Sequence, residues 1–394
     1  MRTRAAVLHE PGTPVVVEEV ELAPPREHEV LVRVAAAGVC HSDVHLADGS
    51  LGAGRWPIVL GHEGAGVVEE VGAGVTHVRR GDHVAFCFVP ACGSCRACRA
   101  GRPNLCEPAG ERAVKGTLMD GTSRLSLPDG TVLQHGLMTA CFAEHAVVDA
   151  ASAVRLPPEL PLWQAALLGC GVVTGIGAVR NTAGVRIGET VCVIGCGGVG
   201  LHVVAGARLA GAARIVAVDQ DPLKLELARR RGATDVLAAD SGDVAAAVLE
   251  LTGGGVDHAF EVVGRPETMR LAWDVLRPGA TAVVVGLAAV GIEVALPAIE
   301  FLSEKGIKGC YYGSANVAAE LPQIVALVAD GRLELADVVS HVSDLAGVED
   351  ALGRLRRGEG ARTILVVDAS LELPAGIERG ELGRGATFEH ERRE

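Results

Sequence analysis

Four cysteines within residues 92–106 constrain this chain more than any other feature. Cys92, Cys95, Cys98 and Cys106 are separated by two, two and seven residues. That spacing lets one small loop surround a single tetrahedral ion, and four thiolates in a closed shell describe a structural zinc site. The alternatives are two disulfides or buried apolar cysteines, but disulfide frameworks are typical of small secreted chains. A closed site leaves no coordination position for a substrate, so we expect any reaction to occur elsewhere.

Length and composition limit the classes of protein that fit. A chain of 394 residues exceeds one hydrophobic core and indicates two domains. The net charge of −13 argues against nucleic acid, whose phosphates require a basic surface. Long apolar runs are interrupted by charges or glycine clusters, so we expect no transmembrane helix. The N-terminus lacks a signal-peptide core, and eleven cysteines then indicate a reducing, cytoplasmic location.

The pattern of apolar residues changes near residue 172. Before it, short apolar runs punctuated by Pro and Gly are typical of a β-rich domain, and the polar, Gly-rich residues 110–140 predict a loop or hairpin. After it, strand and helix patterns alternate, as in a doubly wound parallel sheet covered on both faces. One of these helices, over 222–231, is expected to begin with Asp221 as its N-cap. The sequence therefore predicts an α/β protein with a β-rich first domain and a closing strand at 363–368.

A glycine-rich turn lies between the first strand and the first helix of the doubly wound part. Its G-x-G-x-x-G pattern permits a tight turn, close approach of a pyrophosphate and close helix packing, and its glycines are Gly195, Gly197, Gly198 and Gly200. Asp219 ends the next strand, where a carboxylate accepts hydrogen bonds from an adenosine ribose. Because this carboxylate would repel a 2′-phosphate, we expect NAD rather than NADP. Lys224 fits either the adenosine side of this site or a solvated helix position.

Four further motifs complete a recognisable pattern. They are GVCHSD at 38–43, GHEGAG at 61–66, LGCG at 168–171 and GARTIL at 360–365. With the cysteine lobe and the glycine turn, they make residues 5–368 resemble the zinc-dependent medium-chain dehydrogenase/reductase family, in particular its alcohol dehydrogenases. The resemblance implies a GroES-like catalytic domain from 1–171 and 314–368, and a Rossmann coenzyme domain from 172–313. Residues 369–394 lack a core-forming pattern, and we expect a disordered tail.

The resemblance also assigns roles to individual residues. It implies a catalytic zinc with an open fourth position, whose protein ligands are Cys40, His62 and Cys170. Glu63 would approach the metal transiently, and Asp43 would orient the imidazole of His62.

Other residues would serve the proton and the coenzyme. Ser42 would take the alcohol proton and His45 would pass it to solvent. The remaining implied contacts are to the pyrophosphate (His41, Arg362) and to the nicotinamide ring (Thr174, Val199). The implied reaction is the reversible oxidation of an alcohol, deprotonated at zinc, by hydride transfer to NAD.

The substrate is less constrained than the reaction. The expected substrate wall is apolar, which suits an aliphatic or aromatic alcohol; it consists of Leu51, Phe88, Leu137 and Leu287. Glutathione-dependent formaldehyde dehydrogenases of this family carry a basic residue shortly after the fourth cysteine of this lobe. Here the first basic residue after Cys106 is Arg112. Residues 116–125 nevertheless resemble that branch, so oxidation of a thiol adduct stays open. A non-catalytic dinucleotide-binding protein and a zinc-ribbon nucleic-acid binder are alternatives of other classes.

The chain is also expected to self-associate. The segment around 307–312 is apolar and should lie at a sheet edge, and such edges are normally paired or covered. We therefore expect a homodimer or homotetramer, carrying NAD and two zinc ions per subunit, with a small-molecule alcohol or aldehyde as its other partner.

Overall fold

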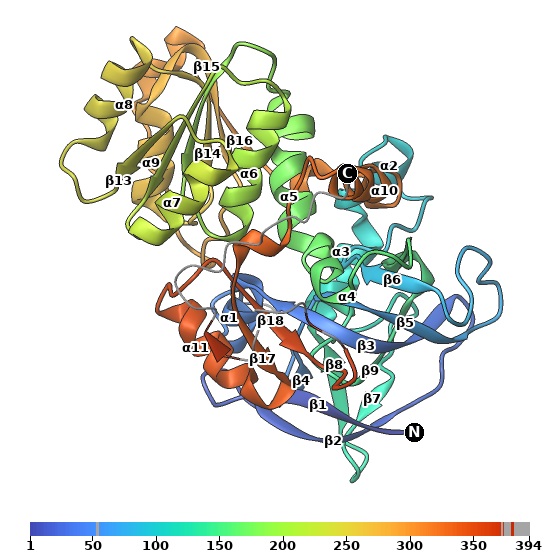
Figure 1. The fold of residues 1–394 in the computed structure, drawn as a ribbon. Helices are drawn as coiled ribbons and strands as arrows, with labels where there is room; N and C mark the ends of the chain where they lie inside the picture. The colour runs from blue at the N-terminus through green and yellow to red at the C-terminus, as the bar shows by residue number, and fades with distance from the viewer. Residues whose placement is uncertain (53–54, 372, 374–379, 382–394) are drawn as a thin grey trace, which may run out of the picture.

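The structure is a computed structural model that describes residues 1–52, 55–371, 373 and 380–381. Figure 1 shows two lobes, a β-rich one that contains the N-terminus and an α/β one formed by the middle of the chain. The last described strands run back to the β-rich lobe, so the chain leaves that lobe and returns to it.

Two sheets form the β-rich lobe. One is a closed barrel in the order β1-β2-β7-β8-β4, whose strands are Arg2–Leu8, Val16–Leu22, Leu125–Ser126, Val132–His135 and Ile58–Val59. The other has the order β10-β6-β5-β3-β18-β17-β19, with β9 also paired to β3. Its strands are Ala153–Leu156, His83–Phe86, Glu63–Val71, Glu29–Val39, Arg362–Val366, Val339–Asp344, Gly380–Glu381 and, for β9, His145–Asp149. Because β18 pairs with β3, the last part of the chain belongs to the sheet of the first.

Six parallel strands form the sheet of the α/β lobe, in the order β13-β12-β11-β14-β15-β16. They are Asp235–Ala238, Arg214–Asp219, Thr190–Ile194, Val256–Glu261, Leu276–Val284 and Gly306–Gly309. The crossover helices are α6 (Gly198–Leu209), α7 (Pro222–Arg231), α8 (Val244–Thr252) and α9 (Pro266–Asp274). Alternate residues of β11 join different cores: Val191 and Val193 pack with residues of α6, whereas Cys192 and Ile194 pack with residues of α8 and α9. A strand apolar on both faces is what a doubly wound sheet requires, and the predicted fold class is confirmed.

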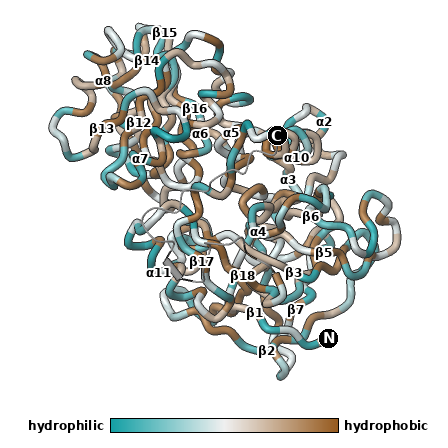
Figure 2. Tube along the Cα trace, viewed as in Figure 1, coloured by the Kyte–Doolittle hydropathy of each residue, from teal (hydrophilic) through white to brown (hydrophobic). Residues whose placement is uncertain are grey.

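The other helices lie in the β-rich lobe or between the lobes. They are α1 (His41–Ala47), α2 (Arg96–Arg99), α3 (Glu107–Lys115), α4 (Leu162–Ala165), α5 (Val173–Gly177), α10 (Val317–Ala329) and α11 (Val348–Arg356). With two π-helical segments, α4 and α5 form one run, Leu162–Ala183. In the described part of the chain this run is the one helix long and apolar enough to span a membrane. However, 94% of its apolar window is buried inside the protein, as in a core helix, and Figure 2 shows hydrophobic residues along this central part.

Local signals placed α7 correctly but missed α3. The Asp221 side chain accepts a hydrogen bond from the Leu223 N–H, and α7 ends at Gly232, whose φ is +115°. The prediction of a loop or hairpin throughout 110–140 is wrong at its start, because α3 extends to Lys115. Its boundaries have physical causes: a proline lies in its first turn and Gly116 takes a left-handed conformation at its end. The hairpin itself exists, as β7 and β8.

The predicted disordered tail, 369–394, lies mostly outside the described residues. Within the described part, Gly380 and Glu381 pair antiparallel with Val342 and His341 of β17. These two residues extend the sheet edge at β17, and the disordered tail stays a prediction because the rest of it lies outside the described residues.

Candidate active site

Three segments far apart in the sequence bring four potential metal ligands together. Cys40 follows β3, His62 precedes β5, and Cys170 lies in the π-helical turn after α4. One ligand atom from each of these residues and from Glu63 lies within 4.8 Å of the others, and all four residues are buried. The Nε2 atom of His62 is buried without a hydrogen-bond partner. Two thiols, an imidazole and an orphaned ring nitrogen fit a zinc ion with an open position.

Asp43 fixes the orientation of His62. One oxygen of its fully buried carboxylate accepts from His62 Nδ1 at 3.0 Å and from the Gly61 N–H, and the other accepts from the Cys40 N–H. The ring nitrogen Nε2 is thereby left for the cluster, as in other carboxylate-oriented ligand histidines. Burial disfavours the imidazolium, but the Asp43 charge outweighs it and raises the pKa of His62.

The two thiols lie side by side and shift each other's ionisation. The contact with Cys170 lowers the pKa of Cys40, and the same contact, together with burial, raises the pKa of Cys170 well above its ordinary value. Thiolate is the form that ligates zinc, and a dication would favour the ionisation of both.

Glu63 and Arg362 form a buried ion pair beside the cluster. Arg362 Nη2 lies 2.6 and 2.7 Å from the two Glu63 oxygens, and Arg362 Nη1 donates to Val39 O. The same guanidinium borders the glycine turn, because a Cβ on Gly198 would lie 2.4 Å from Arg362 Nε. Arg362 Nε itself is buried without a partner. Arg362 therefore joins the predicted metal cluster to the predicted phosphate site.

The glycine turn has the shape of a dinucleotide cradle. Gly195 has a φ of +95°, and a Cβ on Gly200 would lie 1.8 Å from Gly195 O, so neither position accepts a larger residue without strain. A Cβ on Gly197 would meet no atom within 4 Å, which leaves open space at the N-terminus of α6. Asp219 accepts hydrogen bonds from the N–H groups of Cys196 and Asp221 at 2.6 and 2.9 Å, at the end of β12.

The predicted proton-relay residues lie on α1 and are not joined to one another. Ser42 lines the cavity described below, with the Cys40 sulfur 3.9 Å from its hydroxyl. His45 Nδ1 instead bonds to Ser50 Oγ at 2.7 Å. His41 lies beside it, with ring centroids 6.4 Å apart, and burial lowers the pKa of His41.

The other predicted coenzyme residues lie between the lobes. Thr174 is on α5 and Val199 is on α6, and these two helices pack together, so a Cβ on Gly175 would lie 2.7 Å from Val199 O. Lys224 Nζ donates to Gly358 O at 2.7 Å, which ties α7 to the turn after α11.

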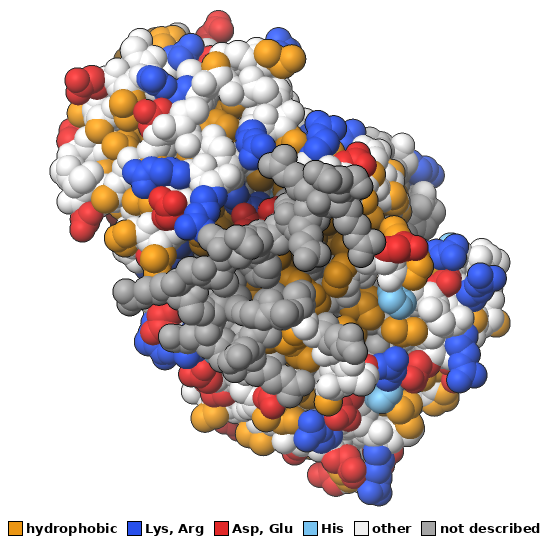
Figure 3. Space-filling view, viewed as in Figure 1, with side chains coloured by type: hydrophobic (Ala, Val, Ile, Leu, Met, Phe, Trp, Pro, Cys, Tyr) orange, Lys and Arg blue, Asp and Glu red, His pale blue; other side chains and the backbone are white. Residues whose placement is uncertain are grey.

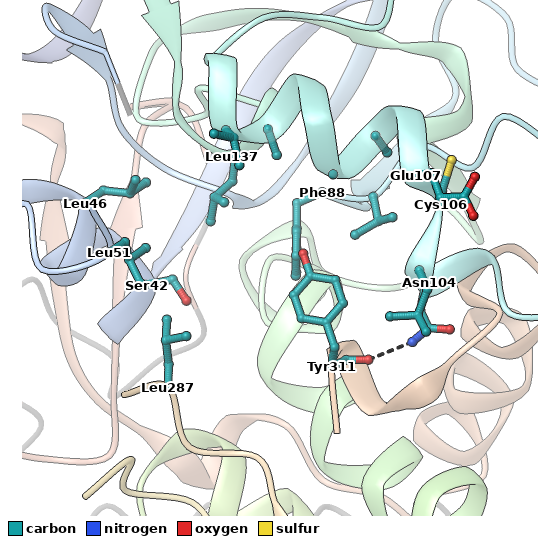
Figure 4. Close-up of a pocket in the computed structure, with 16 residues that line it drawn as sticks. Ser42, Leu46, Leu51, Phe88, Asn104, Cys106, Glu107, Leu137, Leu287 and Tyr311 are labelled. Carbon is teal, nitrogen blue, oxygen red and sulfur yellow. Dashed lines mark hydrogen bonds between the residues drawn. The ribbon is translucent and has the colours of Figure 1, made fainter. Parts of the chain in front are cut away.

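A cavity of about 510 Å³ opens beside the cluster. All four predicted wall residues line it, and Figure 4 shows Leu51, Phe88, Leu137 and Leu287 around it. Phe88 links it to the cluster, because its ring packs edge-on against His62 at 5.4 Å. The sequence analysis missed several other walls, namely Leu46, Asn104, one face of α3 and Tyr311. The sequence did contain a signal for Tyr311, because the only two tyrosines of the chain are adjacent, at 311 and 312.

The four lobe cysteines form a second cluster. Their sulfur atoms lie within 4.8 Å of one another. Backbone N–H groups point at three of the sulfurs, from Cys92 to Cys106, from Cys95 to Cys92 and from Cys98 to Cys95. All eleven cysteines belong to the described residues and all are free thiols, so the disulfide alternative is wrong.

Comparisons with known proteins agree with this geometry. The alcohol dehydrogenase GroES-like domain family matches residues 26–158, and the zinc-binding dehydrogenase family matches residues 198–330. Proteins named S-(hydroxymethyl)glutathione dehydrogenase from Synechocystis sp. and Photobacterium damsela are each 41% identical over 368 residues, which is 93% of this chain and 100% of theirs.

The chain belongs to the zinc-dependent medium-chain dehydrogenase/reductase family.

Solved structures of the family extend this agreement to the whole fold. An alcohol dehydrogenase zinc-binding domain protein from Burkholderia ambifaria superposes with a TM-score of 0.89 at 35% identity, covering 93% of this chain and 99% of that one. Benzyl alcohol dehydrogenase from Acinetobacter calcoaceticus does so with 0.88 at 30% identity, covering 93% and 100%. The chain is therefore an oxidoreductase of a family that uses zinc and a dinucleotide, in a GroES-like and Rossmann arrangement.

Proposed function

We propose that this dehydrogenase oxidises neutral aliphatic or aromatic alcohols to aldehydes or ketones, reversibly, with NAD and two zinc ions per chain. The carrying observation is the apolar cavity of about 510 Å³ beside the Cys40, His62 and Cys170 cluster. Apolar walls hold a hydrocarbon chain by burial, and the few polar groups near them fix its orientation.

The residues around the cavity would have separate roles in the reaction. Zinc held by Cys40, His62 and Cys170 would supply the Lewis acidity that lowers the pKa of an alcohol. Ser42 borders both the cluster and the cavity, so it is the hydroxyl positioned to accept the substrate proton. His45 lies one turn further along α1, on the route to solvent through Ser50. Phe88, which is buried and packs against His62, would shield the reacting carbon from water.

Asp219 supports the choice of NAD. Its carboxylate lies at the end of β12, where an adenosine ribose meets the strand, and it would repel a 2′-phosphate. A structurally similar zinc-binding dehydrogenase from Sinorhizobium meliloti, 27% identical, was solved with NADP, so the family fold alone does not decide the coenzyme. The Asp219→Gly variant should bind NAD more weakly and use NADP relatively better, measured as the ratio of kcat/KM for the two coenzymes. Equal use of both by the unaltered enzyme would contradict this role of Asp219.

Oxidation of a thiol adduct is the second candidate, favoured by the names of the 41% identical relatives. The cavity argues for a neutral carrier in that case. Ala109, Gly110, Ala113 and Val114 line it from one face of α3, whereas Arg112 lies on the other face and donates to Met119 O. No cationic side chain lines this cavity among the described residues. A glutathione carboxylate would therefore lack a partner there.

A substrate panel separates the two candidates. NADH absorbance would be followed with straight-chain and benzylic alcohols, and with formaldehyde alone or premixed with glutathione or a neutral thiol. We expect turnover of the alcohols without a thiol. Turnover that requires formaldehyde and a thiol would instead establish the second candidate.

The partners follow from the surface. On the face drawn in Figure 3, visible Lys and Arg side chains are interspersed with Asp and Glu and form no basic stripe, so we expect no nucleic-acid partner. The strand β16 is an open edge among the described strands, and apolar side chains of the segment just before it are exposed, including Ile299 and Leu302. We therefore propose a cytoplasmic homodimer or homotetramer paired through this edge. A monomer by light scattering at micromolar concentration would contradict it.

A further inference from the structure

One hydroxyl that lines the apolar cavity has no hydrogen-bond partner among the described residues. Four polar side chains line the cavity, and they are Ser42, Asn104, Glu107 and Tyr311. Ser42 lies beside the metal cluster, Asn104 donates its amide to Tyr311 O, and Glu107 is exposed at the start of α3. The Tyr311 hydroxyl forms no hydrogen bond with any described residue. The Tyr311 side chain is 48% exposed, as expected of a residue that lines an open cavity, and a phenol hydroxyl is protonated and able to donate at neutral pH.

The ring of Tyr311 is held in the cavity from two sides. Tyr311 follows β16 of the α/β lobe, and its ring packs edge-on against Phe88 of the β-rich lobe at 6.2 Å. Asn104, which is buried within the four-cysteine lobe, donates to Tyr311 O at 2.9 Å. Figure 4 shows the ring projecting between the two lobes, across the cavity from Ser42. A donor placed this way acts on a part of the substrate away from the cluster.

We propose that Tyr311 is a specificity-determining residue whose hydroxyl donates a hydrogen bond to a neutral oxygen that the substrate carries away from its reacting carbon. The preferred substrates would then be alcohols with a second oxygen, such as an ether, carbonyl or hydroxyl group. Asn104 is a positioning residue, because it sets the Tyr311 backbone from the cysteine lobe. This inference rests on the proposed alcohol oxidation and names its substrate class.

An isosteric series of alcohols tests the proposal. In 2-propoxyethanol, 3-ethoxypropan-1-ol and 4-methoxybutan-1-ol, an ether oxygen replaces one methylene of 1-hexanol at successive positions. An ether oxygen only accepts, and a neutral hydrogen bond changes binding about 3- to 10-fold. We expect Tyr311→Phe to lower kcat/KM for one of these ethers by about that factor relative to 1-hexanol. A loss by the same factor for all four alcohols would overturn the proposal.

The neighbouring tyrosine supplies a matched control. The hydroxyl of Tyr312 is buried and donates to Gly169 O, outside the cavity lining. Tyr312→Phe should therefore leave the ether-to-hexanol ratio unchanged, even where it lowers the melting temperature. A change in that ratio equal to that of Tyr311→Phe would contradict the assignment to Tyr311.

Asn104→Leu tests the positioning role, because leucine keeps the branched shape of the side chain but has no donor. We expect a smaller shift of the same ratio, and no further shift when Tyr311→Phe is added. Zinc content measured on both variants separates this effect from collapse of the lobe. An additive double variant would exclude the positioning role. If the unaltered enzyme oxidises none of the four alcohols, the proposed function fails and not the role of Tyr311.

Discussion

The two cysteine clusters of this dehydrogenase are built in opposite ways. The lobe cluster takes all four sulfurs from residues 92–106, and three of them are only half-buried. The central cluster takes its groups from segments up to 130 residues apart, Cys40 to Cys170, and every one is buried. A carboxylate, an arginine, one β-sheet and a π-helical turn hold the central groups, whereas short turns and backbone N–H groups surround the sulfurs of the four-cysteine lobe.

This difference indicates which interactions stabilise each cluster. In the centre, folding of the β-rich lobe brings the ligands together, and the Asp43 and Arg362 contacts exist without an ion. In the four-cysteine lobe, few apolar side chains are buried, so a bound ion would supply most of the free energy that folds this loop. We therefore expect the metal of the central cluster to be needed for catalysis, and the metal of the four-cysteine lobe to be needed for stability.

We expect the largest effect from removing one sulfur ligand of the four-cysteine lobe. Cys95→Ser removes one ligand of a closed site, and metal binding at isolated structural sites is worth on the order of 10 kcal/mol of folding free energy. We expect zinc content to fall from two to one per chain, with a large drop in melting temperature or aggregation, and loss of activity only as a consequence. Zinc analysis and thermal unfolding on the purified variant measure this.

Cys310→Ser is the matched control for that variant. Cys310 is also partly exposed but lies outside both clusters. It should keep two zinc ions and change stability by about 1 kcal/mol, as for the loss of one neutral hydrogen bond. If Cys95→Ser were as stable as Cys310→Ser, the lobe would not depend on its metal.

A second variant should separate activity from stability. Cys170→Ser removes a soft ligand from a site whose other walls are held by protein contacts. We expect turnover to fall by three orders of magnitude or more, since an alcohol loses its activating ion, a contribution of several kcal/mol. The melting temperature should stay within a few degrees of the unaltered enzyme. Wild-type turnover with one zinc per chain would break the division of labour between the clusters.

The same contrast explains what the sequence could predict. The lobe, the glycine turn and α7 are specified by residues close together in the chain, so motif spacing was enough to find them. The central ligands were found through a family resemblance, because nothing in the local sequence joins Cys40 to Cys170. The contact between Asn104 and Tyr311, 207 residues apart, has no local signal at all.

Other features could not be predicted from the sequence, because a charged residue that looks exposed in the sequence can be buried in an ion pair in the fold. Arg124 is 2% exposed and pairs with Glu29 at the base of the barrel, although its sequence context is a polar loop. Arg362 was expected at a phosphate, yet it also neutralises Glu63. Such ion pairs depend on which strands become neighbours, and composition does not encode that.

The smallest effect contrasts, by pH, a buried carboxyl of the β-rich lobe with the four-cysteine lobe. Asp149 is buried at the end of β9, near Glu29, Asp120 and Arg124, and burial raises its pKa to about 6. A carboxyl whose folded pKa is raised stabilises the fold below its unfolded pKa and loses that contribution as pH rises. The loss is about 3 kcal/mol between about pH 4 and pH 6. The lobe should behave oppositely, because zinc binding weakens as its thiolates protonate at low pH.

Asp149→Asn isolates this contribution. Denaturant unfolding at several pH values should give a variant whose stability, relative to the unaltered enzyme, rises by about 3 kcal/mol from pH 4 to pH 7. Asp240→Asn, at an exposed turn, provides the control and should show a flat difference. The Cys95→Ser variant should differ from the unaltered enzyme least at low pH, where the lobe has already lost its ion. Parallel slopes for Asp149→Asn and Cys95→Ser would contradict the expectation that this buried carboxyl and the four-cysteine lobe respond to protons in opposite ways.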